Sequence, residues 1–569
     1  MVSNKDSAKL HKNEGIKAAS QYLRGTILEG LADTSTGSIS GDDSQLTKFH
    51  GIYLQDDRDL RKERLKAKLE KAFSFMVRIR VPGGVCTPQQ WLHMDALADK
   101  YANGTLKLTT RQAYQIHGVL KRDLKASIAA INEGLLDTIA ACGDVNRNVM
   151  CTANPEQSKL HATVSEHSKV LSNHLTPQTP AYHEIWLDGK LVAGGEPVEE
   201  PIYGKTYLPR KFKSAFVVPP YNDVDIFSQD LGFIAITDEN GQLAGYNVAV
   251  GGGMGMTHNK TKTFPRLADI IGFITPDQML PVAEAIVTTQ RDHGDRTDRK
   301  HARLKYTIED HGIEWFKKEV EQRSKITLQP KRPFTFKTTS DRYGWIQGTD
   351  GLWCLNLFIL SGRVKDSEEL KTKACLREIA KIHQGDFRLT ANQNLVLGKI
   401  TDADRPQIET ILEEYGLLKS HHQSGLRLNS LSCVALPTCG LALAESERLL
   451  PNFVSALEKI LEEVGLRDDA ITLRITGCPN GCARPYLGEI GLVGRAPGKY
   501  NVYLGAGFDG MRLNKRYLEA KKVPEILEAL EKIIRHYASD REQGEAFGNF
   551  VIRTGYVKAT LAGRDFHEN

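Results

Sequence analysis

The chain repeats itself, and this internal repetition limits its possible folds more than any other feature. Residues 104–119 read GTLKLTTRQAYQIHGV, and residues 385–400 read GDFRLTANQNLVLGKI. NRNVMC at 146–151 falls on LNSLSC at 428–433, and YNVAVGGG at 246–253 is echoed by YNVYLGAG at 500–507. Because the three echoes keep one order, they indicate a duplicated module arranged A–B–A′–B′. Pseudo-twofold symmetry would follow, with a site at the interface between the halves.

Hydrophobic periodicity predicts the helices and strands of these modules. Alternating apolar runs at 73–81 and 353–360 predict strands, and amphipathic stretches at 451–465 and 523–538 predict helices. We therefore expect an α+β fold of mixed helices and strands. The expected parts are an extended N-terminal arm with helical stretches (1–70), followed by modules at 71–150, 151–330, 331–425 and 426–569. The arm ends in the charged run 56–71, which we expect to serve assembly or partner docking, with a solvated helix as the alternative.

Four cysteines near the end of the chain predict a metal centre. Cys433 and Cys439 form a C-x5-C pair in CVALPTC, and Cys478 and Cys482 form a C-x3-C pair in TGCPNGC. Two closely spaced pairs on separate segments can surround one centre, and four thiolates are the usual ligands of a [4Fe–4S] cluster. A Zn(Cys)4 site more often uses C-x2-C pairs, and a disulfide is disfavoured in a chain without secretory features. Both stay open as alternatives.

The two halves have diverged in charge. The first half has Arg78 and Arg80, Arg111, Arg147, and the cluster Arg210, Lys211 and Lys213, whereas position 147 falls on Asn429 in the second half. Conversely, Cys478 and Cys482 fall opposite Pro219 and Asp223. One half thus offers cations and the other metal ligands, which predicts one site per chain where an anion is held over a redox centre. A solvated charged face is the alternative for each motif taken alone.

Composition bounds the class of protein. The formal net charge of +5 is small for 569 residues and gives no case for nucleic-acid binding. No apolar run is long enough for a membrane span, and the N-terminus lacks the apolar core of a signal peptide, so we expect a cytoplasmic protein. There is no phosphate-binding GxxxxGK[ST] motif, and the one GxGxxG, at 505–510, lacks a clear helix start. Electrons are therefore expected from a separate protein.

Four segments carry a resemblance to a known family: CVALPTC, TGCPNGC, NRNVMCTANP and TYLPRKFK. Through them, and over nearly its whole length, the chain resembles the siroheme sulfite and nitrite reductase family. It is most similar to the hemoprotein (beta) subunits of the assimilatory NADPH-dependent enzymes. The resemblance implies ferredoxin-like half-domains at 71–150 and 331–425, a siroheme-binding domain with the substrate cations at 151–330, and a siroheme and [4Fe–4S] domain at 426–569. The cofactors would lie at the interface between the halves.

The resemblance also implies roles for individual residues. Cys433, Cys439, Cys478 and Cys482 would bind the cluster, and Cys482 would also be the axial ligand of the siroheme iron. The sulfite-binding, catalytic cations would be Arg78, Arg147, Lys211 and Lys213. Siroheme would be met by Lys107, Arg111, Gln115, Arg147 and Asn480, although Lys107 stands where close relatives can carry arginine. Cys86, Cys142, Cys151, Cys354 and Cys375 match no ligand position and are expected to be core thiols.

The implied reaction is the six-electron reduction of sulfite to sulfide for cysteine biosynthesis. The implied partner is a flavoprotein (alpha) subunit with FAD, FMN and the NADPH site, in a hetero-oligomer. Two other functions stay open: siroheme-dependent nitrite reduction, and a cluster-only electron carrier in which the cations would have no substrate. A zinc-stabilised binding protein, which would be colourless, is a third.

Overall fold

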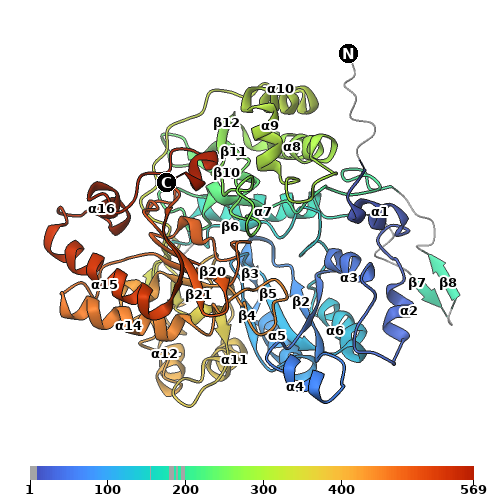
Figure 1. The fold of residues 1–569 in the computed structure, drawn as a ribbon, viewed down its shortest axis with the longest axis horizontal. Helices are drawn as coiled ribbons and strands as arrows, with labels where there is room; N and C mark the ends of the chain where they lie inside the picture. The colour runs from blue at the N-terminus through green and yellow to red at the C-terminus, as the bar shows by residue number, and fades with distance from the viewer. Residues whose placement is uncertain (1–8, 154–155, 179–184, 188–189, 194–198, 569) are drawn as a thin grey trace.

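The computed structural model describes residues 9–153, 156–178, 185–187, 190–193 and 199–568, and within them it contains four five-stranded sheets surrounded by helices (Figure 1). A separate two-stranded ribbon is formed by β7 (Ile185–Leu187) and β8 (Lys190–Ala193). No helix of the described residues is long and apolar enough to cross a membrane.

Two of the sheets exchange an edge strand. The first has the order β1 (Ile52–Asp56), β2 (Phe73–Ile79), β5 (Tyr114–Val119), β4 (Leu106–Leu108) and β15 (Arg363–Val364). The second has the order β13 (Gly344–Gln347), β14 (Trp353–Leu357), β17 (Leu395–Ile400), β16 (Asp386–Leu389) and β3 (Val85–Cys86). Because β15 of the second half pairs with β4, and β3 of the first half pairs with β16, each sheet is completed by the other half.

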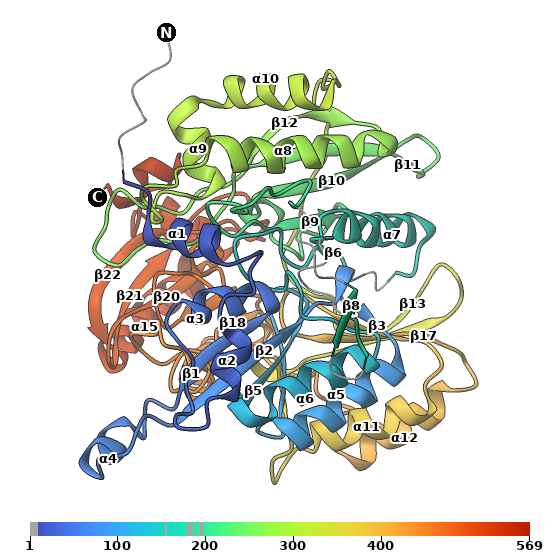
Figure 2. The same ribbon diagram turned by 90° about the vertical axis from the view of Figure 1, so that its right-hand side faces the viewer.

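The helices of these two modules pack together at one end of the molecule (Figure 2). They are α5 (Pro88–Tyr101), α6 (Lys121–Glu133), α11 (Thr372–Ile382) and α12 (Arg405–Glu414). Thr87 starts α5 with a capping box, its side chain accepting from the Gln90 amide. One hydrophobic core runs through both modules and includes Trp91, Leu108, Leu376 and Leu397, all fully buried. The two half-domains therefore form one packed unit.

The other two sheets have the same topology. One has the order β12 (Asp269–Ile274), β11 (Leu243–Val250), β10 (Leu231–Thr237), β9 (Ser214–Val217) and β6 (Met150–Cys151). Its counterpart has the order β22 (Lys515–Lys522), β21 (Lys499–Leu504), β20 (Ile490–Ala496), β19 (Leu473–Thr476) and β18 (Ser430–Ser432). In each, the first three strands in chain order pair in parallel and the last two add antiparallel. The predicted duplication is confirmed at the level of strand order and direction.

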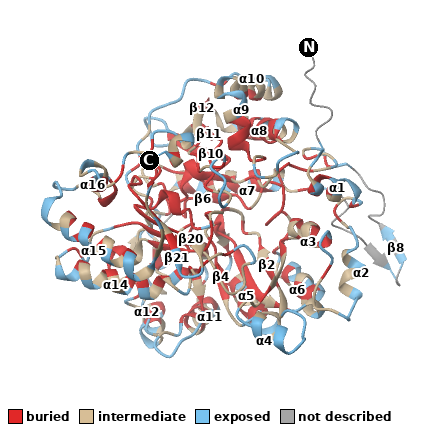
Figure 3. Cartoon of the chain, viewed as in Figure 1, coloured by how far each residue is buried: buried red, intermediate tan, exposed pale blue. Residues whose placement is uncertain are grey.

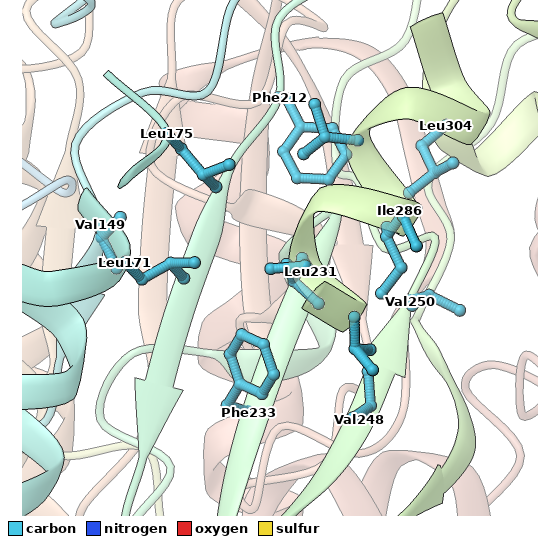
Figure 4. Packing of buried hydrophobic residues seen from close by; sticks show 14 of the residues in the cluster. Val149, Leu171, Leu175, Phe212, Leu231, Phe233, Val248, Val250, Ile286 and Leu304 are labelled. Atoms are coloured by element: carbon cyan, nitrogen blue, oxygen red, sulfur yellow. The ribbon is translucent and has the colours of Figure 1, made fainter. Parts of the chain in front are cut away.

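Each of these sheets has its own helices and its own core. The first packs with α7 (Lys159–His174), α8 (Met279–His293), α9 (Leu304–His311) and α10 (Ile313–Ser324), and the second with α14 (Leu450–Glu463), α15 (Val523–Asp540) and α16 (Phe547–Arg553). Figure 4 shows Leu231 and Val250 of the sheet facing Ile286 of α8 and Leu304 of α9. The strands and helices predicted at 73–81, 353–360, 451–465 and 523–538 are present as β2, β14, α14 and α15.

The N-terminal segment contains the helical stretches expected from the sequence, but most of it packs against the body instead of extending as an arm. It forms α1 (Lys12–Ala19), α2 (Ile27–Ala32), α3 (Asp43–Leu46) and the strand β1, and only α4 (Arg61–Lys66) projects from the body (Figure 2). Leu23, Leu46 and Phe49 belong to the core of the first large module, and parts of the ribbon of this segment carry the red colour of buried residues in Figure 3. The segment is packed because these apolar residues are buried together with an ion pair between Lys17 and Glu14.

Candidate active site

The four cysteines meet at one edge of the last sheet. Cys433 directly follows β18, and Cys478 comes two residues after β19. Because β18 and β19 are parallel neighbours, their C-terminal ends lie at the same edge of the sheet. Cys439 and Cys482 lie on the loops that continue from these ends. Parallel strand ends therefore bring the two cysteine pairs together.

Every pair among the four thiols is close enough to interact electrostatically. Burial and the neighbouring thiols raise the pKa of Cys433 and Cys439, and they raise the pKa of Cys478 to about 12. The Gly477 amide donates to Cys433 Sγ at 3.3 Å, and Asn480 Nδ2 donates to Cys478 Sγ at 3.5 Å. Such N–H donors stabilise thiolate sulfur, and they tune the potential of a cluster bound there.

The four neighbouring cysteines fit the ligand set of a metal cluster better than they fit a group of protonated thiols without a metal. Neighbouring desolvated thiolates repel one another, so a cationic centre is needed to hold four of them deprotonated. In the described part of the chain, no three His, Cys, Asp or Glu side chains are grouped to hold a single metal ion. In a [4Fe–4S] centre each cysteine binds a different iron, so its ligands need not converge on one point.

The predicted cations gather at an edge of the first large sheet. Arg147 precedes β6, while Lys211 and Lys213 precede β9, and the two strands are parallel neighbours joined by a bridge between Asn146 and Phe212. Burial, Arg147 and Arg210 lower the pKa of Lys211 well below its ordinary value. Burial and Lys211 do the same to the pKa of Lys213. Neither lysine forms an ion pair with a carboxylate among the described residues.

Lys211 also connects the cations to the cysteines. The Cys482 thiol is among the groups that act on the Lys211 pKa, and it acts in the direction opposite to the arginines. Lys211 belongs to the first half and Cys482 to the second. The two diverged halves therefore face each other at this point, as the sequence predicted.

Arg78 joins the same group through its neighbours. Its Nη1 donates to Cys142 Sγ at 2.9 Å, its Nη2 donates to Gln115 Oε1 at 3.1 Å, and its guanidinium lies 5.9 Å from the centre of the Tyr53 ring. Arg147 interacts with the same Tyr53 and Cys142 side chains. Arg78 and Arg147 thus share two partners.

The remaining predicted cofactor-binding residues separate into two places. Arg111 is buried, donates to Gln229 Oε1 at 2.6 Å and to the Ser214 carbonyl at 2.7 Å, and has its pKa lowered to about 9 by burial and nearby arginines. Lys107 instead pairs with Glu447 Oε2 at 2.8 Å and donates to the Ser361 carbonyl. Burial lowers the pKa of Lys107, while Glu447 and the Cys433 thiol act to raise it. Lys107 therefore lies on the cysteine side, held by a carboxylate.

A cavity of about 410 Å³ opens between the two halves. His11 of the N-terminal segment, Arg210, Lys211 and Arg303 of the first half, and Asn480 of the cysteine loop line it. Gly255 and Gly481 let the loops around it approach closely, since a Cβ on either would meet backbone oxygen of the other loop at 3.3 or 3.1 Å. The cavity is thus cationic, and it is bordered by the N-terminal segment and by both halves of the chain.

The residues present fit an anionic cofactor. Arg78 Nε and Arg111 Nε are buried without a hydrogen-bond partner among the described atoms. Several buried or half-buried cations, including Lys305, Lys211 and Lys213, repel one another and lower each other's pKa. Buried charges are ordinarily paired, so this set indicates a bound polyanion such as a macrocycle with several carboxylates.

Sequence reasoning missed several residues of this site. Tyr53, Lys48, Arg303 and Lys305 carry no short motif that marks them. Cys142 was expected to be a core thiol, and it is buried like Cys86, Cys151, Cys354 and Cys375, but it also accepts from Arg78. The packing of the N-terminal segment places Tyr53 and Lys48 here, and only its FHGIYLQDDRD sequence, which forms part of the resemblance, could have pointed to them.

Comparison with known proteins places these features in a family. The model for the nitrite/sulfite reductase ferredoxin-like half domain matches residues 67–134 and again 346–415. The model for the nitrite and sulphite reductase 4Fe-4S domain matches residues 166–328. That second match falls on the copy that lacks the four cysteines, so it reflects the repeated domain rather than the ligand set.

Curated relatives and a solved structure cover nearly the whole chain. The protein named sulfite reductase [NADPH] hemoprotein beta-component of a Paenibacillus species is 58% identical over 98% of this chain and 97% of its own length. The protein of the same name from Geobacillus kaustophilus is 57% identical over the same shares. The structure of the Mycobacterium tuberculosis NirA protein matches with a TM-score of 0.78 at 25% identity, covering 96% of this chain and 97% of that one.

Proposed function

The chain belongs to the nitrite and sulfite reductase family, and we propose that it is the hemoprotein subunit that reduces sulfite to sulfide with six electrons. The cofactors of this enzyme family are siroheme and a [4Fe–4S] cluster. The observation that best supports sulfite as substrate is the position of Lys211, which interacts electrostatically with Cys482, Arg147 and Lys213 and has no ion pair with a described carboxylate. These cations would face an oxyanion bound over the redox centre.

The cysteines lie in the second half of the chain and the cations in the first, so each half is proposed to have a different role. When bound, the cluster and siroheme supply the electron transfer and the iron that binds sulfur. We assign Cys433, Cys439, Cys478 and Cys482 to the cluster, with Cys482 shared with siroheme. Arg111, Gln115, Arg147 and Asn480 are assigned to siroheme, and Lys107 to the support of the cysteine side through Glu447.

Binding of the substrate is assigned to Arg78, Arg147, Lys211 and Lys213. Sulfite is an oxyanion, and guanidinium and ammonium groups hold its oxygens with charge-assisted hydrogen bonds. Because these donors are already held in place by the protein, they also stabilise negative charge that develops on an oxygen as it leaves. Tyr53 and Cys142 keep the two arginines oriented.

Protons for the departing oxygens would come from the lysines. Burial and neighbouring cations lower the pKa of Lys211 and Lys213, so their ammonium groups release a proton more readily than an exposed lysine does. Lys48 borders the same group, and burial lowers its pKa to about 8. It interacts with Arg147 and Arg210 and could return protons from the surface.

The electron donor is proposed to be an NADPH-dependent flavoprotein subunit in a hetero-oligomer, with the sulfide used for cysteine biosynthesis. The segment around α4 supports an entry point for electrons. Arg58 donates to the carbonyls of Cys439 at 3.1 Å and Ala442 at 2.6 Å, so this segment lies against the loop that carries a proposed cluster ligand. Leu60, Leu65 and Leu441 are exposed around it. A donor docked there would be close to the cluster.

Sulfide production with two electron sources tests this function. The full chain should form sulfide from sulfite with a chemically reduced viologen, and with NADPH only when the flavoprotein is added. Nitrite is supplied as a competing substrate in the same assay. Failure to form sulfide with reduced viologen, in protein that carries both cofactors, would overturn sulfite reduction.

A further inference from the structure

Asp225 and Arg484 occupy equivalent positions in the two large modules. Each precedes a short 3₁₀ helix, η4 (Ile226–Ser228) or η7 (Pro485–Leu487), and each has left-handed backbone angles, with φ of 46° and 53°. The equivalent strands β10 and β20 follow. The two side chains nevertheless carry opposite charges and form an ion pair with each other. A position in one repeat thus contacts its own counterpart across the pseudo-twofold axis.

A second arginine completes the group. Arg474 of β19 donates through Nη1 to Asp225 Oδ2 at 2.6 Å. Strand pairing aligns Arg474 with Ala215 of β9, so the first half has no equivalent of this arginine. The side chains of Asp225, Arg474 and Arg484 are 1%, 2% and 4% exposed. Burial alone would raise the pKa of Asp225, but the two guanidinium groups lower it, so the carboxylate stays charged.

The group leads directly to the cysteine loop. Arg484 Nη1 donates to the Thr110 carbonyl at 3.1 Å, and its Nη2 donates to the Ala391 carbonyl at 3.0 Å. The Thr110 hydroxyl in turn donates to the carbonyl of Cys482 at 2.9 Å. Arg484 therefore contacts both ferredoxin-like half-domains, and through Thr110 one of them holds the main chain of Cys482.

We propose that Asp225, Arg474 and Arg484 are positioning residues that lock the Cys478–Cys482 loop of the second half onto the first half. They would fix where the Cys482 sulfur lies relative to the cations around Lys211. This inference rests on the proposed function, because it assumes that Cys482 is the ligand shared by the two cofactors.

The charges explain why this contact needs two diverged repeats. In an exact repeat, counterpart positions hold identical residues, and identical charges buried together repel. Because one half has diverged to an acid and the other to arginines, the two positions attract each other. The same divergence means that only one half can hold the cysteine loop. A buried charge left without its partner is strongly unfavourable, so the group also resists slippage between the halves.

The full chain with its cofactors provides the test through Asp225→Asn, with Asp95→Asn as the matched control. Asp95 is also a buried carboxylate that joins the halves, pairing from α5 with Lys373 and Arg377 of α11, but its partners lie away from the cysteine loop. We expect both substitutions to lower the melting temperature. Only Asp225→Asn should change the EPR and absorption signals of the coupled cofactors and reduce turnover, by about ten- to a hundredfold.

A milder variant keeps the proposal testable if Asp225→Asn does not fold. Thr110→Val removes the hydroxyl that holds the Cys482 carbonyl and leaves the buried charges in place, so it should shift the same signals with little change in melting temperature. Wild-type signals and turnover in Asp225→Asn, or in Thr110→Val when the first cannot be made, would overturn the inference, as would equal changes in Asp95→Asn. A wild-type protein without siroheme absorption would instead overturn the proposed function.

Discussion

Replacing Lys213 with methionine should separate catalysis from stability. Lys213 is half-buried, and burial, Lys211 and Arg111 lower its pKa, while no described carboxylate forms an ion pair with it. Methionine keeps the length of the side chain and removes a desolvated charge that its neighbours repel. We therefore expect the melting temperature to stay unchanged or rise. Siroheme and cluster content should stay at the wild-type level.

Turnover of sulfite should fall sharply in the same variant. A charge-assisted hydrogen bond to a substrate oxyanion contributes about 1.5–3 kcal/mol, which corresponds to roughly a ten- to hundredfold loss of rate. The assay is sulfide formation with reduced viologen, which bypasses the flavoprotein. Lys300→Met is the control, because Lys300 lines the cavity that Lys211 also lines, but it is exposed. Normal turnover in Lys213→Met, or an equal loss in the control, would refute the assignment of Lys213 to the oxyanion.

Three further changes test other parts of the site. Cys482→Ser should abolish sulfite reduction and alter both the siroheme and the cluster signals, whereas an unchanged spectrum would rule out a shared ligand. Leu65→Asp combined with Leu441→Asp should weaken electron transfer from the flavoprotein but leave viologen-driven activity intact; equal loss of both activities would mean that α4 supports the fold instead. Lys107 and Arg363 lower the pKa of half-buried Glu447 to about 2 against the burial effect, so Glu447→Gln should destabilise the protein at neutral pH. Because the folded pKa is depressed, that difference should persist above about pH 4.5 and disappear as the pH falls toward 2; a difference that is independent of pH would contradict the ion pair.

The sequence predicted the parts of the fold that rest on repetition and periodicity. The strands at 73–81 and 353–360 and the helices at 451–465 and 523–538 were recovered because their apolar spacing is strong. The exchange of β3 and β15 between the two sheets could not be predicted from the sequence, because two-residue strands have no periodicity. The packing of the N-terminal segment was also missed, since its buried residues Leu23, Leu46 and Phe49 are scattered among polar ones.

The site could be predicted where residue types are chemically distinctive. Four closely spaced cysteines and a divergence in charge between repeats are visible in sequence, and the structure places Lys211 within electrostatic reach of Cys482. Lys107 shows the limit of such reasoning. Its neighbour Glu447 lies 340 residues away, so only the folded chain reveals that this lysine faces a carboxylate. Tyr53 and Cys142 likewise become part of the site only through contacts with Arg78 and Arg147.

The central claim is that one half of the chain holds a coupled siroheme and cluster while the other half presents cations to it. The visible absorption spectrum of the purified full chain, recorded with its iron and acid-labile sulfide contents, tests this most directly. The account predicts siroheme bands together with acid-labile sulfide, and bands that shift when sulfite is added to the reduced protein. A colourless protein containing zinc, or a cluster spectrum without siroheme bands, would contradict it.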